Sequence, residues 1–596
     1  MLYRIFPFLS WIQEAKDPNV LRADFIAGLT VALVLIPQSM AYAQLAGLPA
    51  YFGLYIALFP VIVAALWGSS RQLATGPVAV VSLLTASALI PLVGNPDSMT
   101  TDELLSKYVP LALMLAFLVG AFQLLLGLFR LGVVVNFLSH PVIVGFTNAA
   151  ALIIGLSQLS KIFGVEMSRS ESFVSDIWGV LLQVGNTDIP TFLFGVSAFV
   201  IMWGFRKYLP KIPGVLAAVV ISIIVSKIIG FGPTLDDAGK VIDPGMGGGI
   251  VGVIPQGLPT ISLPHFEFDL FGSLIFSAIA ISLVGFMEAI SIAKAMAAKT
   301  KDRIDPNQEL IGQGLGNIVG SMSQAYPASG SFSRSAVNLN AGAKSGMSSV
   351  FTAVIVLITL LFLTPLLYDL PKAVLAAVIM MAVIGLINFK AMKHAWDVNK
   401  HDGIASGVTF VATLLFAPHL DKGIMVGAGL AILLYLYRTL SPRVAVLGRY
   451  KDGTLRDTDV YKELPTDENI VAVRFDGSLY FANVSYFEEA MLKAVADNPK
   501  AKYLLVVGDA INQLDASGEE VLHHLVERLN ANQITVVFSG LKRQVLDVMR
   551  KSGLYDHVGE QNIFATEDMA LDAIYSWMGM DADGAACPLK YIRTMA

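Results

Sequence analysis

The stretch Tyr326–Asn338, which reads YPASGSFSRSAVN, lies deep in a strongly apolar chain, yet it is built of small and hydroxyl-bearing residues around Arg334. A segment so poor in aliphatic side chains cannot face lipid, so at membrane depth it must line a cavity or be buried in protein. An arginine at the bilayer centre costs about 2.5 to 3.5 kcal/mol to insert, and ionisable residues kept there usually mark a substrate or ion path. The alternative is a loop arginine at the water interface.

The composition indicates an integral membrane protein with a soluble extension. Of the 596 residues, 55% are hydrophobic and only 15% are charged, with a mean hydropathy of +0.65, whereas a soluble domain carries about 25% charged residues. The net charge of -5 gives no reason to expect a nucleic-acid partner. Long apolar runs stop near Leu440, so the predicted divisions are a cytoplasmic N-terminal segment 1–22, a transmembrane domain 23–440, a linker 441–465, a soluble domain 466–578 and a mobile tail 579–596.

Runs long enough to cross a bilayer predict fourteen segments. They are placed at 24–45, 50–67, 76–93, 108–129, 137–159, 190–206, 212–231, 270–297, 309–325, 330–343, 345–364, 366–388, 403–419 and 422–440. Every second connection is rich in Lys and Arg, which is typical of cytoplasmic loops. This parity predicts both termini in the cytoplasm, and it requires the poorly hydrophobic 330–343 stretch as a membrane segment.

Two segments are interrupted at corresponding positions of the two halves, which points to a transporter binding site. Residues 68–84 change from polar to apolar at Gly76 and Pro77, and Ser329 and Gly330 stand at the similar point of the second half. We predict that a half-helix starts at each place, because free N–H groups and the positive end of the helix dipole attract anions. The alternative is a pair of ordinary helix starts at the membrane surface.

After Ser441 the pattern changes to that of a soluble α/β domain. The runs Ile470–Gly477, Tyr503–Asp509 and Ile534–Gly540 are rich in β-branched residues and alternate with helical patterns. Strands that alternate with helices predict a sheet covered by helices. The lone cysteine, Cys587, excludes an intrachain disulfide.

Several long motifs resemble, in order, those of the sulfate permease (SulP) family of anion transporters. They are DFIAGLTVALVLIPQSMAYAQLAGLPAYFGLY (Asp24–Tyr55), GSSRQLATGPVAVVSL (68–83), SLVGFMEAISIAKAMA (Ser282–Ala297), NQELIGQGLGNIVGS (Asn307–Ser321), SGSFSRSAVN (329–338) and the DASG motif of a STAS domain (Asp515–Gly518). The resemblance implies an α-helical polytopic membrane protein with fourteen membrane segments in two inverted repeats of seven, followed by a soluble α/β STAS domain. It also implies a core domain of segments 1–4 and 8–11, a gate domain of segments 5–7 and 12–14, and a homodimer.

The resemblance also implies a site between the starts of segments 3 and 10. Its substrate-binding residues would be Gln38 and Tyr42 on a broken first helix near Pro37, together with Val78, Ser331, Ser333 and Arg334. The chemistry fits, because backbone N–H groups, hydroxyls and a guanidinium fork hold an oxyanion without a metal or cofactor.

The glycines of Asn307–Ser321 are spaced as expected for close packing between membrane helices.

Two further residues, Glu288 and Ser517, each have two possible roles. Glu288 lies inside an apolar run, where it either binds a proton or helps to hold a cation, or forms a static ion pair with Arg334. The resemblance implies the first role, because a glutamate at this position is implicated in coupling in proton-coupled members of the family. Ser517 matches the phosphorylated serine of anti-sigma-factor antagonists, although a role as the N-cap of the following helix is favoured.

We therefore expect secondary active transport of an inorganic oxyanion, sulfate first, across the inner or plasma membrane by symport with H⁺ or Na⁺. The alternatives are a bicarbonate or C4-dicarboxylate symporter, an anion exchanger or channel-like conductor, and a membrane-anchored protein whose STAS domain binds a cytoplasmic partner. No enzymatic constellation or metal site is expected, because the neighbouring His523 and His524 do not share a helix face.

Overall fold

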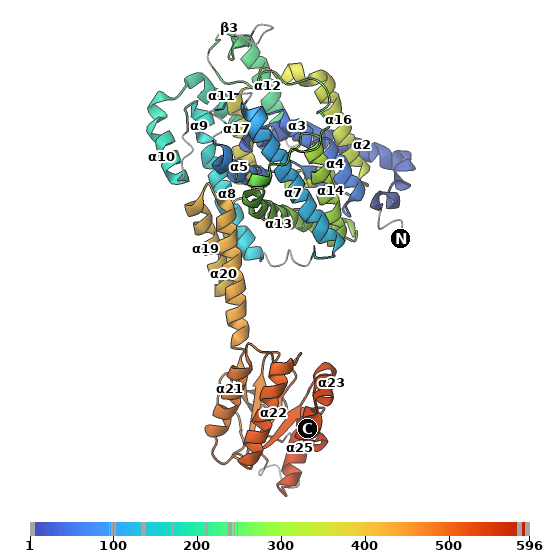
Figure 1. Ribbon diagram of the computed structural model, residues 1–596, viewed down its shortest axis with the longest axis vertical. Helices are drawn as coiled ribbons and strands as arrows, with labels where there is room; N and C mark the ends of the chain where they lie inside the picture. Colours follow the sequence, from blue (N-terminus) through green and yellow to red (C-terminus); the bar gives the residue numbers. More distant parts are fainter. Residues whose placement is uncertain are drawn as a thin grey trace. The chain divides into compact units, whose positions relative to one another are not determined.

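The computed structural model describes residues 6–580, apart from 95, 97–98, 101–102, 133–138, 168–171, 210–212, 236–240, 244 and 247, together with residues 587–590. The chain divides into two compact units, Met1–Ala431 and Ile432–Ala596. The first is a helical assembly and the second is an α/β domain (Figure 1). The predicted combination of a helical membrane unit with a soluble α/β domain is confirmed.

Each predicted membrane segment overlaps a helix. These helices are α2 (Pro18–Leu45), α3 (Phe52–Ile56) with α4 (Phe59–Trp67), α5 (Ala79–Val93), α7 (Val109–Leu128), α8 (His140–Ser157), α11 (Ile189–Tyr208), α12 (Gly214–Ile229), α13 (Phe268–Thr300), α14 (Pro306–Met322), α15 (Phe332–Asn340), α16 (Met347–Ile358), α17 (Lys372–Ile384), α19 (Lys400–Phe416) and α20 (Leu420–Leu440). Shorter elements between them are α9 (Leu159–Phe163), α10 (Phe173–Leu182), β2 (Thr234–Leu235), β3 (Val241–Asp243) and α18 (Phe389–Val398).

Only some of these helices are long and apolar enough to cross a membrane by themselves. Among the described residues there are 8 such helical spans, which include α2, α7, α13 and α20. α15 has 9 residues and is therefore only about 14 Å long at 1.5 Å per residue. The count of fourteen segments thus depends on short helices such as α5 and α15, which begin within the helical unit.

Those two helices are joined by a short antiparallel ladder. β1 (Ala74–Gly76) pairs with β4 (Ser329–Ser331), so that Thr75 lies opposite Gly330. All six ladder residues are buried. Backbone N–H and C=O groups at membrane depth need hydrogen-bond partners within the protein. The ladder supplies these partners where the backbone is not helical. It also brings the starts of α5 and α15 together.

The predicted half-helix starts are therefore shifted. Gly76, Ser329 and Gly330 belong to the ladder, and Pro77 follows it, whereas the helices begin at Ala79 and Phe332. The change from polar to apolar sequence marks the place correctly. The pairing of Thr75 with Gly330, however, joins residues 255 positions apart, and such pairing leaves no signal in local hydropathy.

The first membrane helix is also different from its prediction. α2 runs without interruption from Pro18 to Leu45, with Pro37 inside it and Asp17 as its N-cap. Proline removes one helical N–H bond, but here the helix continues on both sides. The helix also starts earlier than the boundary predicted at residue 23.

α14 packs closely on α7 and α4, as its glycines predicted. A Cβ atom added to Gly312 would lie 2.5 Å from the backbone nitrogen of Gly68, and one added to Gly314 would lie 2.6 Å from that of Leu124. Real Cβ atoms do not approach so closely, so both positions require glycine. The close approach allows the polar side chains of α14 to reach the loops before α5 and α15.

The second unit is built on a sheet with the strand order β10-β9-β8-β7-β5-β6. The parallel strands are β7 (Ile470–Phe475), β8 (Tyr503–Val507), β9 (Thr535–Ser539) and β10 (Ile563–Phe564). The first three confirm the predicted strands. The helices around the sheet are α21 (Val484–Ala496), α22 (Ala516–Ala531), α23 (Arg543–Ser552), α24 (Leu554–Val558) and α25 (Glu567–Trp577).

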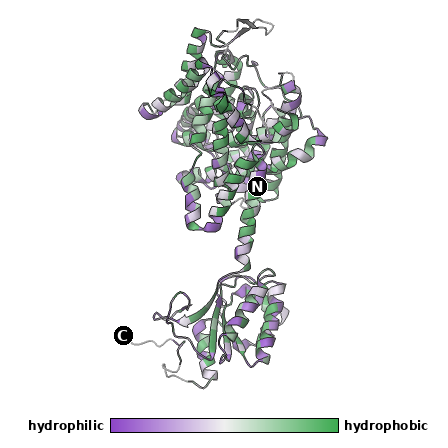
Figure 2. Ribbon diagram, turned by 90° about the vertical axis from the view of Figure 1, so that its left-hand side faces the viewer, coloured by the Kyte–Doolittle hydropathy of each residue, from purple (hydrophilic) through white to green (hydrophobic). Residues whose placement is uncertain are grey.

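Alternate residues of each strand face two separate cores. In β7, Val471 and Val473 pack in the core that contains residues of α21 and α22, whereas Ile470 and Ala472 pack in the core that contains residues of α25. Figure 2 shows hydrophobic strands and helices of mixed character, as expected for helices with one face on the sheet and one in water.

Two predicted boundaries of this unit need correction. Residues 441–465, predicted as a linker, contain β5 (Val444–Arg449) and β6 (Leu455–Asp457), which extend the sheet in antiparallel fashion. Within the predicted mobile tail, Cys587 and Leu589 are buried beside α25. The phenol of Tyr575, whose pKa is raised by burial, accepts a hydrogen bond from the Leu589 N–H at 3.1 Å. Residues 581–586 and 591–596 of the tail lie outside the described residues.

Candidate functional site

A cavity of about 290 Å³ lies where α5 and α15 begin. Its walls come from α2, from the starts of α5 and α15, from α13 and from the end of α17. The lining residues are Gln38, Tyr42, Val78, Ala79, Val80, Glu288, Ser331, Phe332, Ser333, Met381, Ala382, Gly385 and Leu386. The structure therefore brings together five of the six predicted substrate-binding residues, and Glu288 joins them.

The first turns of α5 and α15 both border this cavity. Val78 and Ser331 are the N-cap residues, and neither helix start has a side chain that caps it. The first N–H groups of a helix have no partner within the helix, and the helix dipole adds positive potential there. Two such turns at one cavity make a site for an anion. The hydroxyls of Ser331 and Ser333, 3.4 Å apart, add donors beside them.

α2 contributes two polar side chains to the cavity wall. Gln38 and Tyr42 are one helical turn apart, so both point to the same side of α2. Both are buried, and the Oε1 atom of Gln38 has no hydrogen-bond partner among the described residues. A buried carbonyl oxygen without a donor is costly. This atom accepts, so the group in the cavity that pairs with it must carry a hydrogen, as water does, whereas an oxyanion can bind only to the N–H groups of the same amide.

Arg334 occupies a different place from the one predicted, because it does not line the cavity. Its side chain is 1% exposed, and its Nη2 atom donates to the carbonyl of Pro77 at 2.8 Å. Within the described part of the chain, its Nε and Nη1 atoms have no hydrogen-bond partner. The guanidinium thus links α15 to the residue before the N-cap of α5 and adds a positive charge behind both helix starts.

Glu288 lines the cavity from α13 and is half-buried. No ion pair within 4.0 Å joins it to Arg334 in the residues that the structure describes. The static ion pair between these two residues, which was one of the two alternatives, is therefore not formed. Ser329 ties the ladder to the same helix, because its hydroxyl donates to the carbonyl of Gly285 at 2.7 Å.

A row of polar residues on α14 supports the site and was missed from the sequence. Glu309, Gln313 and Asn317 are buried and are spaced four residues apart, on one face of the helix. Glu309 accepts from the N–H groups of Ser69 and Ser70 at 2.9 and 3.0 Å. The spacing of these residues was the available signal, but the glycines between them suggested packing alone.

Gln313 holds strand β1 of the ladder, and Asn317 holds the residue directly before strand β4. The amide of Gln313 donates to the Thr75 hydroxyl at 2.9 Å. Asn317 binds Ala328 on both sides: its Oδ1 accepts from the Ala328 N–H at 2.7 Å, and its Nδ2 donates to the Ala328 carbonyl at 3.2 Å. α14 therefore fixes the segments that lead into α5 and α15.

Replacing Asn317 with alanine is expected to lower both stability and transport. The change leaves the buried N–H and carbonyl of Ala328 unpaired, and each unpaired group costs about 1 to 3 kcal/mol. Thermal unfolding of the purified protein in detergent measures the loss. Asn340→Ala is the matched control, because Asn340 is exposed at the end of α15. Equal melting temperatures for the two variants would show that the hydrogen bonds between Asn317 and Ala328 do not stabilise the protein.

In the second unit, the expectation that Ser517 caps its helix is wrong. α22 begins at Ala516, and its N-cap is Asp515, whose carboxylate accepts from the Gly518 N–H at 2.8 Å. The same carboxylate accepts from the Phe481 N–H at 2.9 Å. Ser517 lies in the first turn and is half-buried, and its phosphorylation remains a prediction.

The helical unit and its cavity define a multi-pass membrane transporter for an anion. Comparison with known proteins identifies its family: the model of the sulfate permease family matches residues 21–409, and that of the STAS domain matches residues 461–570. The chain belongs to the sulfate permease family and ends in a STAS domain, as the sequence motifs predicted.

Curated relatives and solved structures agree with this assignment. Sulfate transporter 4.1, chloroplastic, of Arabidopsis thaliana is 36% identical over 571 residues, which cover 94% of this chain and 81% of that protein. High affinity sulfate transporter 2 of Stylosanthes hamata is 34% identical over 589 residues, which cover 95% of this chain and 85% of that protein. The SLC26A9 structure has a TM-score of 0.86 at 23% identity over 98% of this chain and 95% of that chain, which establishes the shared fold.

Proposed function

We propose that this protein carries an inorganic oxyanion, sulfate first, by secondary active transport. The observation that supports this most strongly is that the uncapped first turns of α5 and α15 face one cavity with the Ser331 and Ser333 hydroxyls. These groups are donors, and they suit the oxygens of a tetrahedral anion. Arg334 adds positive charge from behind the helix starts rather than by lining the cavity.

The set of helices that forms the cavity walls supports a mechanism of alternating access. α2, α5, α13 and α15 correspond to segments of the expected core domain, and α17 corresponds to the first segment of the second gate group. A cavity between the two groups opens to one side or the other when the core moves against the gate, as transporters with inverted repeats do. The anion is then carried with the core.

Glu288 is proposed to couple this movement to a cation. A carboxylate in the cavity wall can take up H⁺ or lie beside Na⁺, and either ion reduces the repulsion between Glu288 and a bound anion. Symport follows if the loaded core moves only when both are bound. Exchange without a cation is the alternative outcome of the test below.

The alternation of Lys- and Arg-rich loops along the chain supports a proposal for the membrane orientation of the protein. We place the protein in the inner or plasma membrane, with both termini and the STAS domain in the cytoplasm. We also propose a homodimer, and a cytoplasmic protein as a partner of the STAS domain.

Purified protein in liposomes is expected to accumulate labelled sulfate when an inward H⁺ or Na⁺ gradient is imposed. Unlabelled sulfate should compete strongly, and succinate, bicarbonate, oxalate and chloride weakly. Accumulation of bicarbonate or succinate instead would contradict the substrate. Sulfate uptake that needs an internal anion but no cation gradient would contradict symport and establish exchange.

A further inference from the structure

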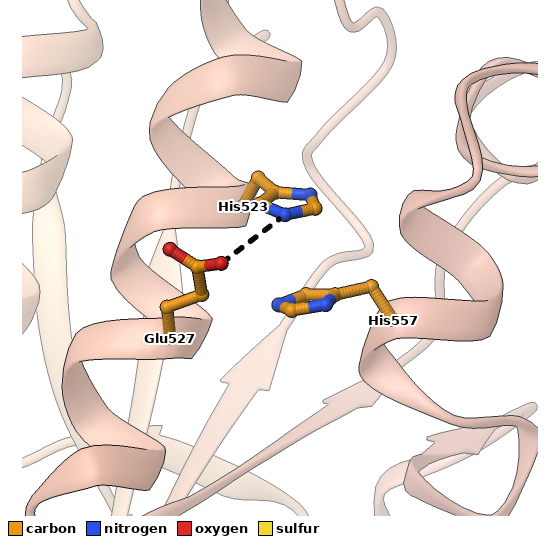
Figure 3. A group of neighbouring side chains, drawn as sticks. All are labelled: His523, Glu527 and His557. Atoms are coloured by element: carbon orange, nitrogen blue, oxygen red, sulfur yellow. Dashed lines mark ion pairs between the residues drawn. The ribbon is translucent and has the colours of Figure 1, made fainter.

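Two histidines and a glutamate from two helices of the STAS domain come together on its surface. Figure 3 shows His523 and Glu527 one turn apart on α22, with His557 facing them from α24. One ligand atom from each residue lies within 4.8 Å of the other two, and Nε2 of His523 is 3.6 Å from Oε1 of Glu527. The rings of His523 and His557 stack with centroids 3.9 Å apart.

The sequence hid this cluster because its second imidazole is 34 positions away. From the motif HHLVER we expected no metal site, since His523 and His524 lie on different faces of a helix. That reasoning holds for the two neighbours. The second ligand is instead His557, which only the packing of α24 against α22 brings into place.

The helices that carry the three side chains are held firmly. Leu522 and Val526 of α22 and Leu554 and Val558 of α24 belong to one buried core. The backbone positions of His523, Glu527 and His557 are thus set by packed neighbours, and only the half-buried side chain of His523 and the exposed side chains of Glu527 and His557 need to turn. A ligand set on rigid elements is what a metal site requires.

We propose that His523, Glu527 and His557 bind a divalent transition-metal ion, with Zn²⁺ as the best match. Two imidazoles and one carboxylate are a ligand set that Zn²⁺ takes in proteins, with bonds of about 2.0 to 2.2 Å. Tetrahedral geometry then places ligand atoms about 3.3 Å apart, close to the 3.6 Å between His523 and Glu527. Mg²⁺ and Ca²⁺ prefer oxygen ligands throughout.

Binding requires a small rearrangement. The stacked rings must turn so that one nitrogen of each points to the shared position beside the Glu527 carboxylate, which rotation about the side-chain bonds of the half-buried His523 and the exposed His557 would achieve. A fourth position stays open for water or for a side chain of a partner protein. The ion would clamp α24 to α22, the helix that begins with the DASG motif.

The test uses the full-length protein in detergent, stripped of metal with a chelator and free of a polyhistidine tag. Calorimetric titration with Zn²⁺ is expected to show one site that His523→Ala and His557→Ala each weaken by at least about tenfold, since even the loss of a supporting residue costs that much. Co²⁺ should give the visible absorption of a tetrahedral site. Mg²⁺ should not compete.

His524→Ala is the matched control. His524 also approaches Glu527, with its Nδ1 3.7 Å from Oε2, but it lies outside the cluster. Its replacement should leave the affinity within about twofold, because it supplies no ligand. Loss of binding in His524→Ala with none in His557→Ala would overturn the proposed ligands. Equal affinity in all variants, or no Zn²⁺ binding by the parent protein, would overturn the site itself.

Discussion

The variant Arg334→Ala is expected to lose almost all sulfate uptake in liposomes while remaining folded. The Nη2 atom of Arg334 donates to the Pro77 carbonyl at 2.8 Å, directly before the N-cap of α5, and the charge lies behind both helix starts. A hydrogen bond to a charged group contributes about 1.5 to 3 kcal/mol, which corresponds to a roughly 10- to 150-fold lower rate. Initial rates of labelled-sulfate uptake measure the effect.

Two further variants separate the charge of Arg334 from its position. Arg334→Lys keeps the positive charge but lacks the planar fork, so it should transport at an intermediate rate. Arg206→Ala removes an exposed arginine at the end of α11 and should transport normally. Uptake by Arg334→Ala at the parent rate would refute the role of Arg334, and a monodisperse profile in detergent excludes misfolding as the cause of a loss.

The variant Glu288→Gln is expected to keep the fold and the anion site but to lose its response to the cation gradient. Glutamine has nearly the shape of a protonated glutamate, yet it cannot release a proton or place a negative charge beside Na⁺. Sulfate should then exchange across the membrane without accumulating. The measurement is uptake with and without an imposed H⁺ or Na⁺ gradient, compared with sulfate-for-sulfate exchange.

Asp269→Asn provides the control on the same helix. Asp269 is an exposed acidic residue in the first turn of α13, far along the chain from Glu288. Its replacement removes the same charge but leaves the cavity unchanged, so gradient-driven uptake should persist. If Glu288→Gln also kept full gradient dependence, Glu288 would be a residue of the cavity wall with no part in coupling.

Much of the site could be predicted from the sequence, but for different reasons at different residues. The half-helix region was visible locally, since the change from polar to apolar at Gly76 and the polar run around Ser331 stand out in hydropathy. Gln38 and Val78 were named only through resemblance to a family. Asn317 was missed because a buried amide on a glycine-rich helix does not reveal which carbonyl it binds.

The sequence by itself determined the features that depend on neighbouring residues. Apolar runs define the helices, β-branched runs such as Ile470–Phe475 define strands, and the stretch Tyr326–Asn338 is too polar to face lipid. These patterns depend on contacts within a few residues, or on the contrast between lipid and water, and both can be read along the chain.

Only the tertiary structure decided what depends on distant partners. It paired Thr75 with Gly330 in a ladder, set Arg334 behind the cavity rather than in its wall, and turned the expected linker into β5 and β6. It also brought His557 to His523. Such contacts join residues tens to hundreds of positions apart, and the packing that creates them has no counterpart in local sequence.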